Sequence, residues 1–357
     1  MKVYVYPADI YGCGHYRMIM PYEQVKKQFA CDMDVEIIYP SERINLSAKI
    51  QGDTVIDVEI PDDADVVVMQ RVTHDYLAQA IPIIRKKGVA VVIDMDDDLT
   101  RINPKNPAYW HFHPANPTPH NWVNAQRACS DATWVTVTTP ALAERYGHEG
   151  RTSILKNYVP AWYLDVQHHD STLVGYAGSL HSHPDDVPLI ANAANRLQQM
   201  GQEFHIVSSH DGMMSALNLI RPPIGPGALD QARWPFELSK IGIGLAPLAD
   251  TEFNRAKSWL KMLEMAAVGV PCIGSPRADY SLLHNMGVGL LVEKQKDWIR
   301  KIQLLQREDA MRLDLAAQGR EAVSRLTYEK KAYEWAGTIL AAYEFERKDR
   351  SVFNRRG

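Results

Sequence analysis

Short, continuous apolar runs alternate with amphipathic segments through the first half of the chain. The apolar runs predict buried strands at residues 2–6, 35–39, 66–70, 90–93, 134–138 and 153–155. The amphipathic segments predict helices at residues 15–29, 76–87, 121–129 and 140–146. Continuous apolar runs separated by helices are typical of a parallel sheet that helices cover on both faces.

The same alternation restarts in the second half, after a stretch at residues 155–172 that has no clear periodicity. Strands are predicted there at residues 173–176, 204–208, 241–248, 271–274 and 289–292. Helices are predicted at residues 185–200, 228–238, 258–268 and 280–285, and three more near residues 295–306, 308–325 and 328–347. We therefore expect an α/β fold of two facing, doubly wound Rossmann-like domains, residues 1–160 and 161–357, with a helical C-terminus.

Composition narrows the class of protein. The net charge of −4 and the pI near 6.4 argue against a dedicated nucleic-acid binder, which would usually be strongly basic. The four cysteines are scattered without a CxxC pair, which fits a reducing compartment. The N-terminus lacks the apolar core of a signal peptide, and no apolar run reaches about 18 residues. We expect a cytoplasmic protein without a membrane span.

Cations gather where the predicted strand at residues 241–248 leads into the next helix. Arg255 and Lys257 lie in the loop, Ser258 is the predicted helix start, and Lys261 follows one turn later. A helix N-terminus carries unpaired N–H groups and a partial positive charge, so nearby cations are unfavourable unless an anion compensates them. A bound diphosphate would be such an anion.

Glu264 lies farther along the same predicted helix, and Gly12 and Gly14 follow the first predicted strand. A carboxylate beside a phosphate site suits the hydroxyl groups of a ribose. The two glycines allow positive φ and close approach of the backbone to a phosphate or sugar, although a plain tight turn would also use them. The dinucleotide-binding fingerprint G-x-G-x-x-G is incomplete, because Arg17 occupies the position of its third glycine. This counts against an NAD enzyme.

Four carboxylates, Asp94, Asp96, Asp97 and Asp98, follow the predicted strand at residues 90–93. They would lie at the carboxyl edge of the sheet, where open α/β folds bind ligands. Three interpretations remain: a Mg²⁺ or Mn²⁺ site, recognition of acceptor hydroxyls, or caps of a solvated helix start. We favour acceptor recognition, because carboxylates accept hydrogen bonds from hydroxyl groups.

Two HxH pairs are further candidates. His111 and His113 lie in a proline-rich stretch, residues 100–120, that predicts a long functional loop. His181 and His183 follow the strand predicted at residues 173–176. Each pair is half a metal site at most, because no third ligand lies nearby in the sequence. His181 would face a donor's phosphates or sugar, and His183 would begin the next helix.

Several motifs together resemble GT-B glycosyltransferases of the large retaining group called family 4. They are YGCGHYR (11–17), TVTTPALAERYG (136–147), KNYVP (156–160), VGYAGSLHSHPDD (174–186) and GLAPLADTEFNRAKSWLKMLEMAAVGVPCIGSP (244–276). The NRAKSxLK core is also similar to that of glycosyltransferases encoded by bacteriophages. The resemblance implies transfer of a sugar from a nucleotide-sugar donor, without a metal or other cofactor and with no obligatory base or nucleophile.

The residue assignments that follow are predictions. The predicted catalytic residues, which would contact the leaving diphosphate, are Arg255, Lys257, Lys261 and His181. Donor contacts are assigned to Gly12, Gly14, Arg17, Gly178, Ser179, Ser258 and Glu264. Acceptor contacts are assigned to Asp96, Asp97, Asp98, His111 and His113.

Two departures from the family pattern keep other functions open. The family's E-x7-E pair is represented by Glu264 alone, since the first position is Ala256, and no Lys or Arg lies between Gly175 and Asn195. A nucleotide-sugar epimerase of the same fold and a catalytically silent sugar- or nucleotide-binding protein are the alternatives. The acceptor stays open among a protein, a glycan, a small molecule and a modified DNA base.

Overall fold

Both predicted parallel sheets are present, each in its own unit of the chain. The computed structural model describes residues 1–41, 45–116, 120–227 and 229–353. Unit 1 comprises residues 1–102 and 108–157 together with the C-terminal helix from Tyr328 onward, and unit 2 comprises residues 103–107 and 158–327. The sequence assigned that C-terminal helix to the second domain, whereas its contacts place it in unit 1.

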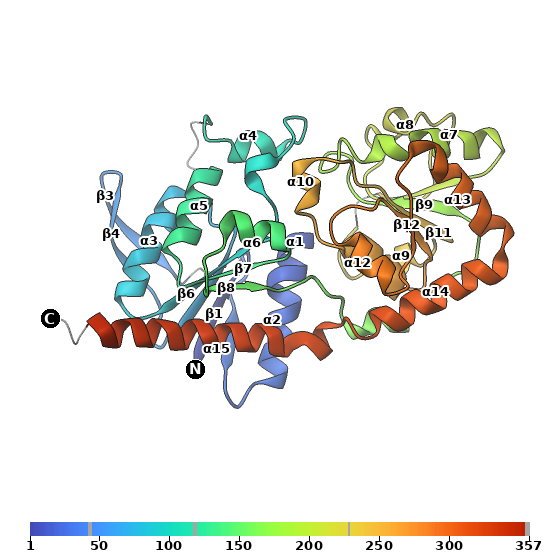
Figure 1. The fold of residues 1–357 in the computed structure, drawn as a ribbon. Helices are drawn as coiled ribbons and strands as arrows, with labels where there is room; N and C mark the ends of the chain where they lie inside the picture. Colours follow the sequence, from blue (N-terminus) through green and yellow to red (C-terminus); the bar gives the residue numbers. More distant parts are fainter. Residues whose placement is uncertain (42–44, 117–119, 228, 354–357) are drawn as a thin grey trace. The chain divides into compact units, whose positions relative to one another are not determined.

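The sheet of unit 1 is parallel throughout and has the strand order β2-β1-β5-β6-β7-β8 (Figure 1). The strands are β1 (Lys2–Tyr6), β2 (Asp34–Ile37), β5 (Val66–Gln70), β6 (Ala90–Met95), β7 (Trp134–Val137) and β8 (Thr152–Ile154). The central strands β5 and β6 are buried along their whole length, which explains why they read as unbroken apolar runs.

Helices cover both faces of this sheet, since α3 packs with α5 and α2 packs with α15, and both α3 and α15 contact β6. The helical elements are α1 (Gly12–Gly14), π-helical η1 (His15–Ile19), α2 (Met20–Gln28), α3 (Asp75–Lys86), 3-10 helix η2 (Leu99–Arg101), α4 (Ala108–Phe112), α5 (Trp122–Asp131), α6 (Pro140–Tyr146) and α15 (Tyr328–Phe353). The helix predicted at residues 15–29 is thus the continuous succession α1, η1 and α2. Part of the predicted proline-rich loop is helical as η2 and α4, and its residues 117–119 lie outside the described residues.

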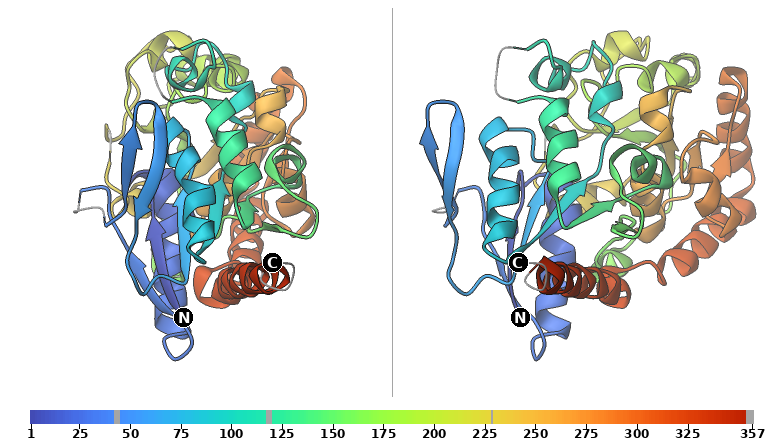
Figure 2. Two further views of the ribbon diagram at one scale, coloured as in Figure 1. Left: turned by 90° about the vertical axis from the view of Figure 1, so that its left-hand side faces the viewer. Right: turned by 60° about the vertical axis from the view of Figure 1, so that its left-hand side comes forward.

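An antiparallel hairpin, β3 (Ser47–Gln51) with β4 (Thr54–Glu59), stands apart from the main sheet (Figure 2). It packs against α3, where the side-chain oxygen of Gln79 accepts the backbone N–H of Val55 at 2.9 Å. The sequence did not predict this hairpin, because its strands are mostly exposed and carry few apolar residues.

The sheet of unit 2 is also parallel and has the order β10-β9-β11-β12-β13. Its strands are β9 (Val174–Ala177), β10 (Phe204–Val207), β11 (Ile243–Ala246), β12 (Cys272–Gly274) and β13 (Leu290–Leu291). Its helical elements are η3 (Ala161–Asp165), η4 (Val187–Ile190), α7 (Ala191–Gln199), α8 (Met213–Ala216), α9 (Trp234–Leu238), α10 (Glu252–Arg255), α11 (Leu260–Ala267), α12 (Tyr280–Asn285), α13 (Gln295–Arg307) and α14 (Asp309–Val323). The predicted α/β class with two Rossmann-like parts is confirmed.

Prolines account for two helices that are shorter than predicted. Within the described residues, the helix predicted at residues 228–238 is observed only as α9, with Pro235 in its first turn; residue 228 lies outside them. The helix predicted at residues 185–200 begins as the 3-10 turn η4, again with proline in the first turn, before α7 follows. Proline favours the first turn of a helix, and here it is the second residue of both α9 and η4.

Helix α15 is fastened to unit 1 by buried polar contacts. The Tyr328 hydroxyl donates a hydrogen bond to the backbone carbonyl of Tyr16, and the Trp335 ring centroid lies 5.9 Å from the Arg17 guanidinium carbon. Farther along, the Glu346 carboxylate, 5% exposed, accepts from the Arg85 Nε at 2.8 Å. These contacts join residues more than 250 positions apart, so local sequence patterns carry no trace of them.

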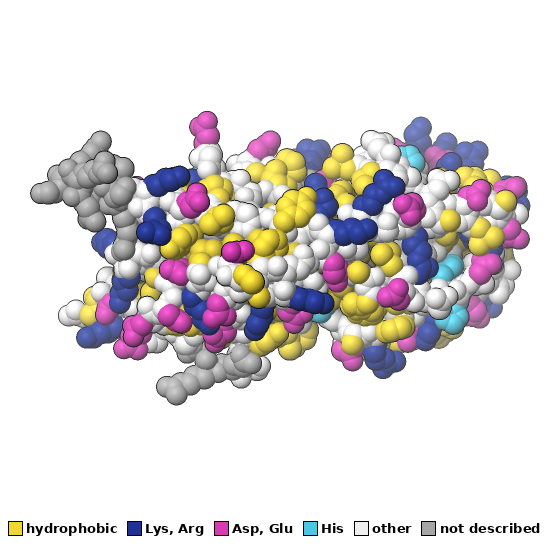
Figure 3. Space-filling view, turned by 90° about the horizontal axis from the view of Figure 1, so that it is seen from below, with side chains coloured by type: hydrophobic (Ala, Val, Ile, Leu, Met, Phe, Trp, Pro, Cys, Tyr) yellow, Lys and Arg dark blue, Asp and Glu magenta, His cyan; other side chains and the backbone are white. Residues whose placement is uncertain are grey.

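Charges of both signs are interspersed on the face drawn in Figure 3, with apolar patches between them. That mixture agrees with the modest net charge of −4 and gives this face no broad basic field for a polyanion. Within the described ranges, no helix combines the length and the apolar character needed to cross a membrane.

Candidate functional site

Lys261 is a partly buried cation at the start of α11 in unit 2. Its Nζ donates a hydrogen bond to the Tyr176 hydroxyl at 3.3 Å and lies 5.2 Å from the centroid of that ring. Burial lowers the pKa of Lys261 to about 8; Asp186 opposes this effect and Lys257 adds to it. An ammonium group that is costly to bury gains from a bound anion, because the anion replaces the lost hydration.

Gly178 leaves the space in which this lysine lies. It follows β9 directly and has a φ of +143°, which side chains other than glycine rarely adopt. A Cβ atom there would lie 2.9 Å from the Tyr176 hydroxyl oxygen and 3.2 Å from Cε and Nζ of Lys261. Both backbone conformation and space therefore require glycine at this strand end.

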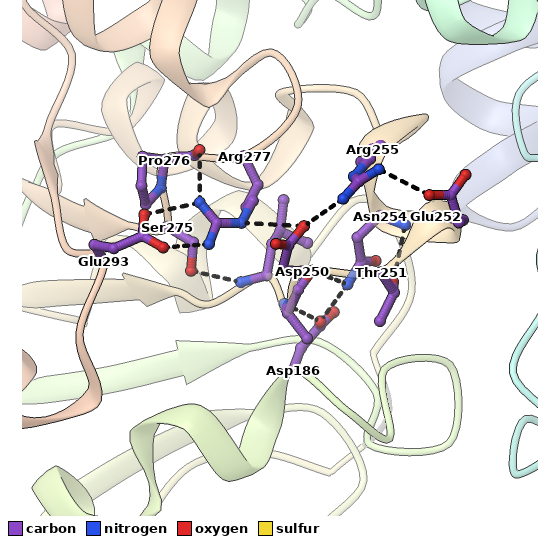
Figure 4. Close-up of polar contacts among 12 residues, drawn as sticks. Asp186, Asp250, Thr251, Glu252, Asn254, Arg255, Ser275, Pro276, Arg277 and Glu293 are labelled. Carbon is purple, nitrogen blue, oxygen red and sulfur yellow. Dashed lines mark hydrogen bonds and ion pairs between the residues drawn. The ribbon is translucent and has the colours of Figure 1, made fainter.

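Asp186 holds the loop between β11 and α11 in place (Figure 4). One carboxylate oxygen accepts the backbone N–H of Ala249 at 2.8 Å and the side-chain amide of Asn254 at 2.6 Å. The other lies 2.8 Å from Nδ1 of His183. Burial and the neighbouring Lys261 lower the pKa of His183 to about 4, so the imidazole is neutral and donates through Nδ1–H.

Two arginines near this loop are engaged with acids (Figure 4). Arg255, a predicted phosphate contact, is exposed and lies 2.8 Å from Glu252 and 3.3 Å from Asp250. Arg277 pairs with Glu293 and lies 3.7 Å from Asp250. Exposed pairs of this kind contribute little to stability, roughly 0–1 kcal/mol, so Arg255 can exchange its partners for a ligand.

Glu264, the predicted ribose contact, is 4% exposed on α11. Its Oε1 accepts the indole N–H of Trp234, from α9, at 2.9 Å. Sequence reasoning missed Trp234, as it missed Tyr176 and Asp186. Tyr176 and Asp186 left a local signal, since both belong to the VGYAGSLHSHPDD stretch, whereas Trp234 left none.

The other predicted residues of unit 2 lie in the loops beside these groups. Lys257 places its Nζ 4.4 Å from the Phe253 ring centroid, between α10 and α11. Ser258 precedes the observed helix, which begins at Leu260. Ser179 and His181 lie in the turn after β9, and His181 is exposed.

In unit 1, the two predicted donor glycines have a structural explanation. Gly14 has a φ of −61°, and a Cβ atom there would lie 1.6 Å from the backbone carbonyl oxygen of Asp9. Gly12 is likewise not among the residues with positive φ. The glycine-rich loop is therefore a helix start packed on the Asp9 turn, and the positive φ values expected there are absent.

Arg17, also a predicted donor contact, is 1% exposed and is committed to the interior of unit 1. Its guanidinium binds Asp94 through Nε at 3.1 Å and through Nη2 at 2.6 Å. It also donates to Asn157 at 3.1 Å and to the Leu155 carbonyl. The Thr136 hydroxyl donates to Asp94 at 2.7 Å. The pair is a buried structural ion pair, so we leave Arg17 out of the proposed donor site.

The carboxylates after β6 diverge toward different partners. Asp96 lies 3.7 Å from Nε of Arg71, whereas Asp98 caps η2 by accepting the backbone N–H of Thr100 at 3.0 Å. Asp97 is half-buried between them. The capping interpretation therefore holds for Asp98. Among the described residues, no group of three His, Cys, Asp or Glu side chains is arranged to hold a metal ion.

The two loop histidines of unit 1 separate. His111, on α4, lines a pocket of about 590 Å³ at the ends of β1 and β5. Nδ1 of His113 instead accepts the backbone N–H of Ala115 at 3.2 Å within its own turn. Of the predicted acceptor residues, only His111 lines this pocket.

Comparison with known proteins relates this chain to a class of enzymes. Residues 188–337 match the family model described as Glycosyl transferase-like. No curated protein matches the chain by sequence.

Solved structures extend the likeness to nearly the whole chain. Sucrose-phosphate synthase from Thermosynechococcus elongatus is similar with a TM-score of 0.60 and 13% identity, covering 99% of this chain and 100% of that one. HepE from Anabaena, in complex with UDP and glucose, has a TM-score of 0.62 and 14% identity, covering 96% and 100%. The catalytic domain of starch synthase IV from Arabidopsis thaliana, bound to ADP and acarbose, has a TM-score of 0.61 and 12% identity, covering 96% and 99%.

The fold is that of the GT-B glycosyltransferases. The predicted enzyme class, glycosyltransferase, is confirmed at the level of this fold and of the family match over residues 188–337.

Proposed function

We propose that this protein is a glycosyltransferase that moves a sugar from a nucleotide-sugar donor to an acceptor hydroxyl, with the nucleotide bound in unit 2. One observation carries the proposal: Lys261 is a partly buried cation with a lowered pKa, and it lies beside a strand-end glycine whose lack of a side chain leaves room for the lysine. Neighbours of the same fold are described in complex with UDP or ADP, which supports a nucleotide in this position.

The proposed roles follow from charge. The donor diphosphate gains negative charge as its bond to the sugar breaks, so cations aimed at it act mainly in the transition state. We assign that role to Lys261 and Lys257, with Arg255 free to turn from its acidic partners. Ser179, His181 and Ser258 lie in the adjoining loops and complete the proposed donor contacts. Glu264 binds the ribose, oriented by the Trp234 indole.

We further propose transfer with retention of the anomeric configuration, independent of a metal ion. Both points rest on the resemblance to retaining family 4 enzymes in the motifs around β9 and α11. Asp186 then acts as a positioning residue, because the hydrogen bonds that it accepts from Ala249 and Asn254 fix the loop that carries Lys257. The cytoplasmic location stays a prediction. All four cysteines are free thiols.

A panel of nucleotide sugars, followed by thermal shift, tests the proposal. A correct donor stabilises the folded state by mass action, by about 2.7 kcal/mol at a concentration one hundred times its Kd. Lys261→Met should abolish the shift, whereas Lys296→Met, an exposed lysine on α13, should keep it. Absence of any shift, or an equal shift in both variants, would contradict the assignment.

Product analysis with the donor so identified separates the alternatives. A transferase releases nucleotide only slowly until an acceptor is added. Acceptor-independent formation of an altered nucleotide sugar would indicate an epimerase. Tight binding without turnover for every acceptor class would indicate a silent binding protein.

A further inference from the structure

A pocket in unit 1 has a mostly apolar wall that the sequence did not predict. It lies at the carboxyl ends of β1 and β5, where Tyr6 and Met69 are among its lining residues, and its volume is about 590 Å³. Ligand pockets for small molecules commonly enclose about 300–1,000 Å³. Strand ends of a parallel sheet are also where such folds bind ligands.

Apolar side chains form most of the wall. They include Leu46, Met69, Leu77 and Phe112, which come from separate parts of unit 1. None of the described residues that line the pocket is acidic, so Asp96, Asp97 and Asp98 do not contribute to it. A site built for the many hydroxyls of a sugar would need acceptor groups, and carboxylates are the strongest of these. The wall suits an apolar body instead.

Gln70 supplies a hydrogen-bond donor that lacks a partner. It is 4% exposed at the end of β5, and its Oε1 accepts the backbone N–H of Ala8 at 3.1 Å. Its Nε2 has no hydrogen-bond partner among the described residues. A buried polar group without a partner costs about 1–3 kcal/mol, so an oxygen atom of a ligand would relieve that cost.

Arg71, next along the chain, also lines the pocket but gives it little net charge. Its guanidinium pairs with Asp9 and lies 3.7 Å from Asp96. Its φ of +46° is uncommon for a residue with a side chain, and such strain often marks a ligand site. The acid partners neutralise this arginine, so the pocket offers donors without attracting an anion strongly.

Three histidines also line the pocket, and His74 offers it a further donor. Nδ1 of His74 accepts the backbone N–H of Tyr76 at 3.3 Å, so the neutral ring carries its proton on Nε2. Burial lowers the pKa of His74, and the nearby His120 adds to this effect. The His74 and His120 rings meet edge to face with centroids 5.1 Å apart, and His111 completes the set.

We propose that this pocket binds an uncharged, flat aromatic alcohol, whose ring lies among Leu46, Met69, Leu77 and Phe112 and whose oxygen accepts from the Gln70 amide. Resting on the function proposed above, such an alcohol is the sugar acceptor. Its hydroxyl oxygen forms the bond to the anomeric carbon. The bond from that carbon to the diphosphate breaks with its electron pair on the diphosphate, which also takes the hydroxyl proton.

Calorimetry with 2-naphthol, without any nucleotide, tests the binding directly. Two control ligands are matched to it: methyl β-glucoside has hydroxyls without an aromatic ring, and 2-naphthoate has the ring with a negative charge. We expect saturable binding of 2-naphthol at least tenfold tighter than that of either control. Tighter binding of the glucoside would overturn the apolar assignment, and tighter binding of the naphthoate would overturn the neutral one.

Variants place the ligand within the pocket. Leu77→Trp fills it and should weaken 2-naphthol binding at least tenfold, whereas Leu340→Trp, on the exposed side of α15, should not. Gln70→Glu keeps an oxygen for the Ala8 N–H but removes the unpaired donors, and it should weaken binding by a similar factor. Full binding by either folded pocket variant would overturn the proposal.

The outcomes separate this inference from the proposed function. Normal nucleotide binding with no affinity for 2-naphthol refutes the pocket assignment alone. Saturable 2-naphthol binding in a protein that binds no nucleotide sugar refutes the transferase and leaves the pocket assignment intact. Formation of a naphthyl glycoside, detected by mass spectrometry and lost in Leu77→Trp, supports both.

Discussion

The Nζ atom of Lys261 lies 3.2 Å from the position that a Cβ atom on Gly178 would occupy. The first residue of the loop after β9 and the first turn of α11 therefore share one small space. The glycine at this strand end leaves room for the lysine side chain. Phosphate sites of α/β proteins commonly combine these features.

Gly178→Ala should weaken both folding and nucleotide binding. The φ of +143° costs a non-glycine residue on the order of 1–3 kcal/mol, and the added methyl also pushes on Lys261. Gly201→Ala is the matched control, because Gly201 has a φ of +83° but no atom within 4 Å of its ideal Cβ position. Urea denaturation and UDP calorimetry on both variants separate backbone strain from crowding. Equal nucleotide affinities in the two variants would argue against the shared space.

Nucleotide affinity should fall as pH rises through about 8. Burial lowers the pKa of Lys261 to about 8, so the ammonium that attracts a diphosphate is lost above that value. UDP binding measured by calorimetry from about pH 7 to 10 checks this, and in Lys261→Met the dependence on pH should be flat.

The same titration should change stability in the opposite direction. Between about pH 8 and the ordinary lysine value of 10.5, the unfolded chain binds the proton and the folded chain does not. The free energy of unfolding of the nucleotide-free protein should therefore rise over this range relative to that of Lys261→Met. A falling difference would mean that Lys261 is stabilised by a partner within the protein.

Glu264→Gln should weaken nucleotide binding by about 1.5–3 kcal/mol, the usual contribution of a hydrogen bond to a charged group. The fold should persist, because the amide oxygen can still accept the Trp234 indole N–H. Wild-type protein should prefer UDP to 2′,3′-dideoxy-UDP, and the variant should lose that preference. If the preference survives the substitution, Glu264 does not bind the ribose.

Arg17→Met should destabilise unit 1 by about 3–5 kcal/mol, because it leaves the buried Asp94 carboxylate unpaired. Adding Asp94→Asn should recover part of this loss by removing the stranded charge. Urea denaturation of the single and double variants measures both effects. A loss of nucleotide affinity without a loss of stability would instead return Arg17 to the donor site.

Sugar transfer should survive treatment with EDTA. In the proposed site, the cations at the start of α11 would supply the charge that a metal otherwise provides. The acids at the end of β6 pair with separate arginines, Asp94 with Arg17 and Asp96 with Arg71. Activity that disappears with chelator and returns with Mn²⁺ would show that a metal takes part.

Local patterns were enough to predict the sheets, because β5 and β6 are buried along their length and are apolar except at Gln70 and Asp94 near their carboxyl ends. They were also enough to locate Lys261 and Glu264, since both lie on one helix next to one strand. The Arg17–Asp94 pair was beyond such reasoning, because its members lie 77 positions apart. A sequence shows that a charge exists, but its partner depends on the packing.

The pocket of unit 1 was missed for a related reason. Leu46, Leu77 and Phe112 have ordinary surroundings in the sequence, and only the folded chain brings them to one wall. The acids after β6 form a conspicuous cluster in the sequence. We therefore predicted that they bind the hydroxyl groups of the acceptor. Most of those carboxylates instead neutralise arginines or cap a helix.

The return of α15 to unit 1 has a consequence for synthesis on the ribosome. In the sequence, residues 158–327 stand between two parts of unit 1. The sheet of unit 1 is therefore synthesised long before α15, the helix that completes its packing. Until Trp335 and Tyr328 arrive, the Arg17 region lacks part of its cover. Chains usually fold from the N-terminus as they emerge. Here we expect the second unit to reach its native state before the first one does.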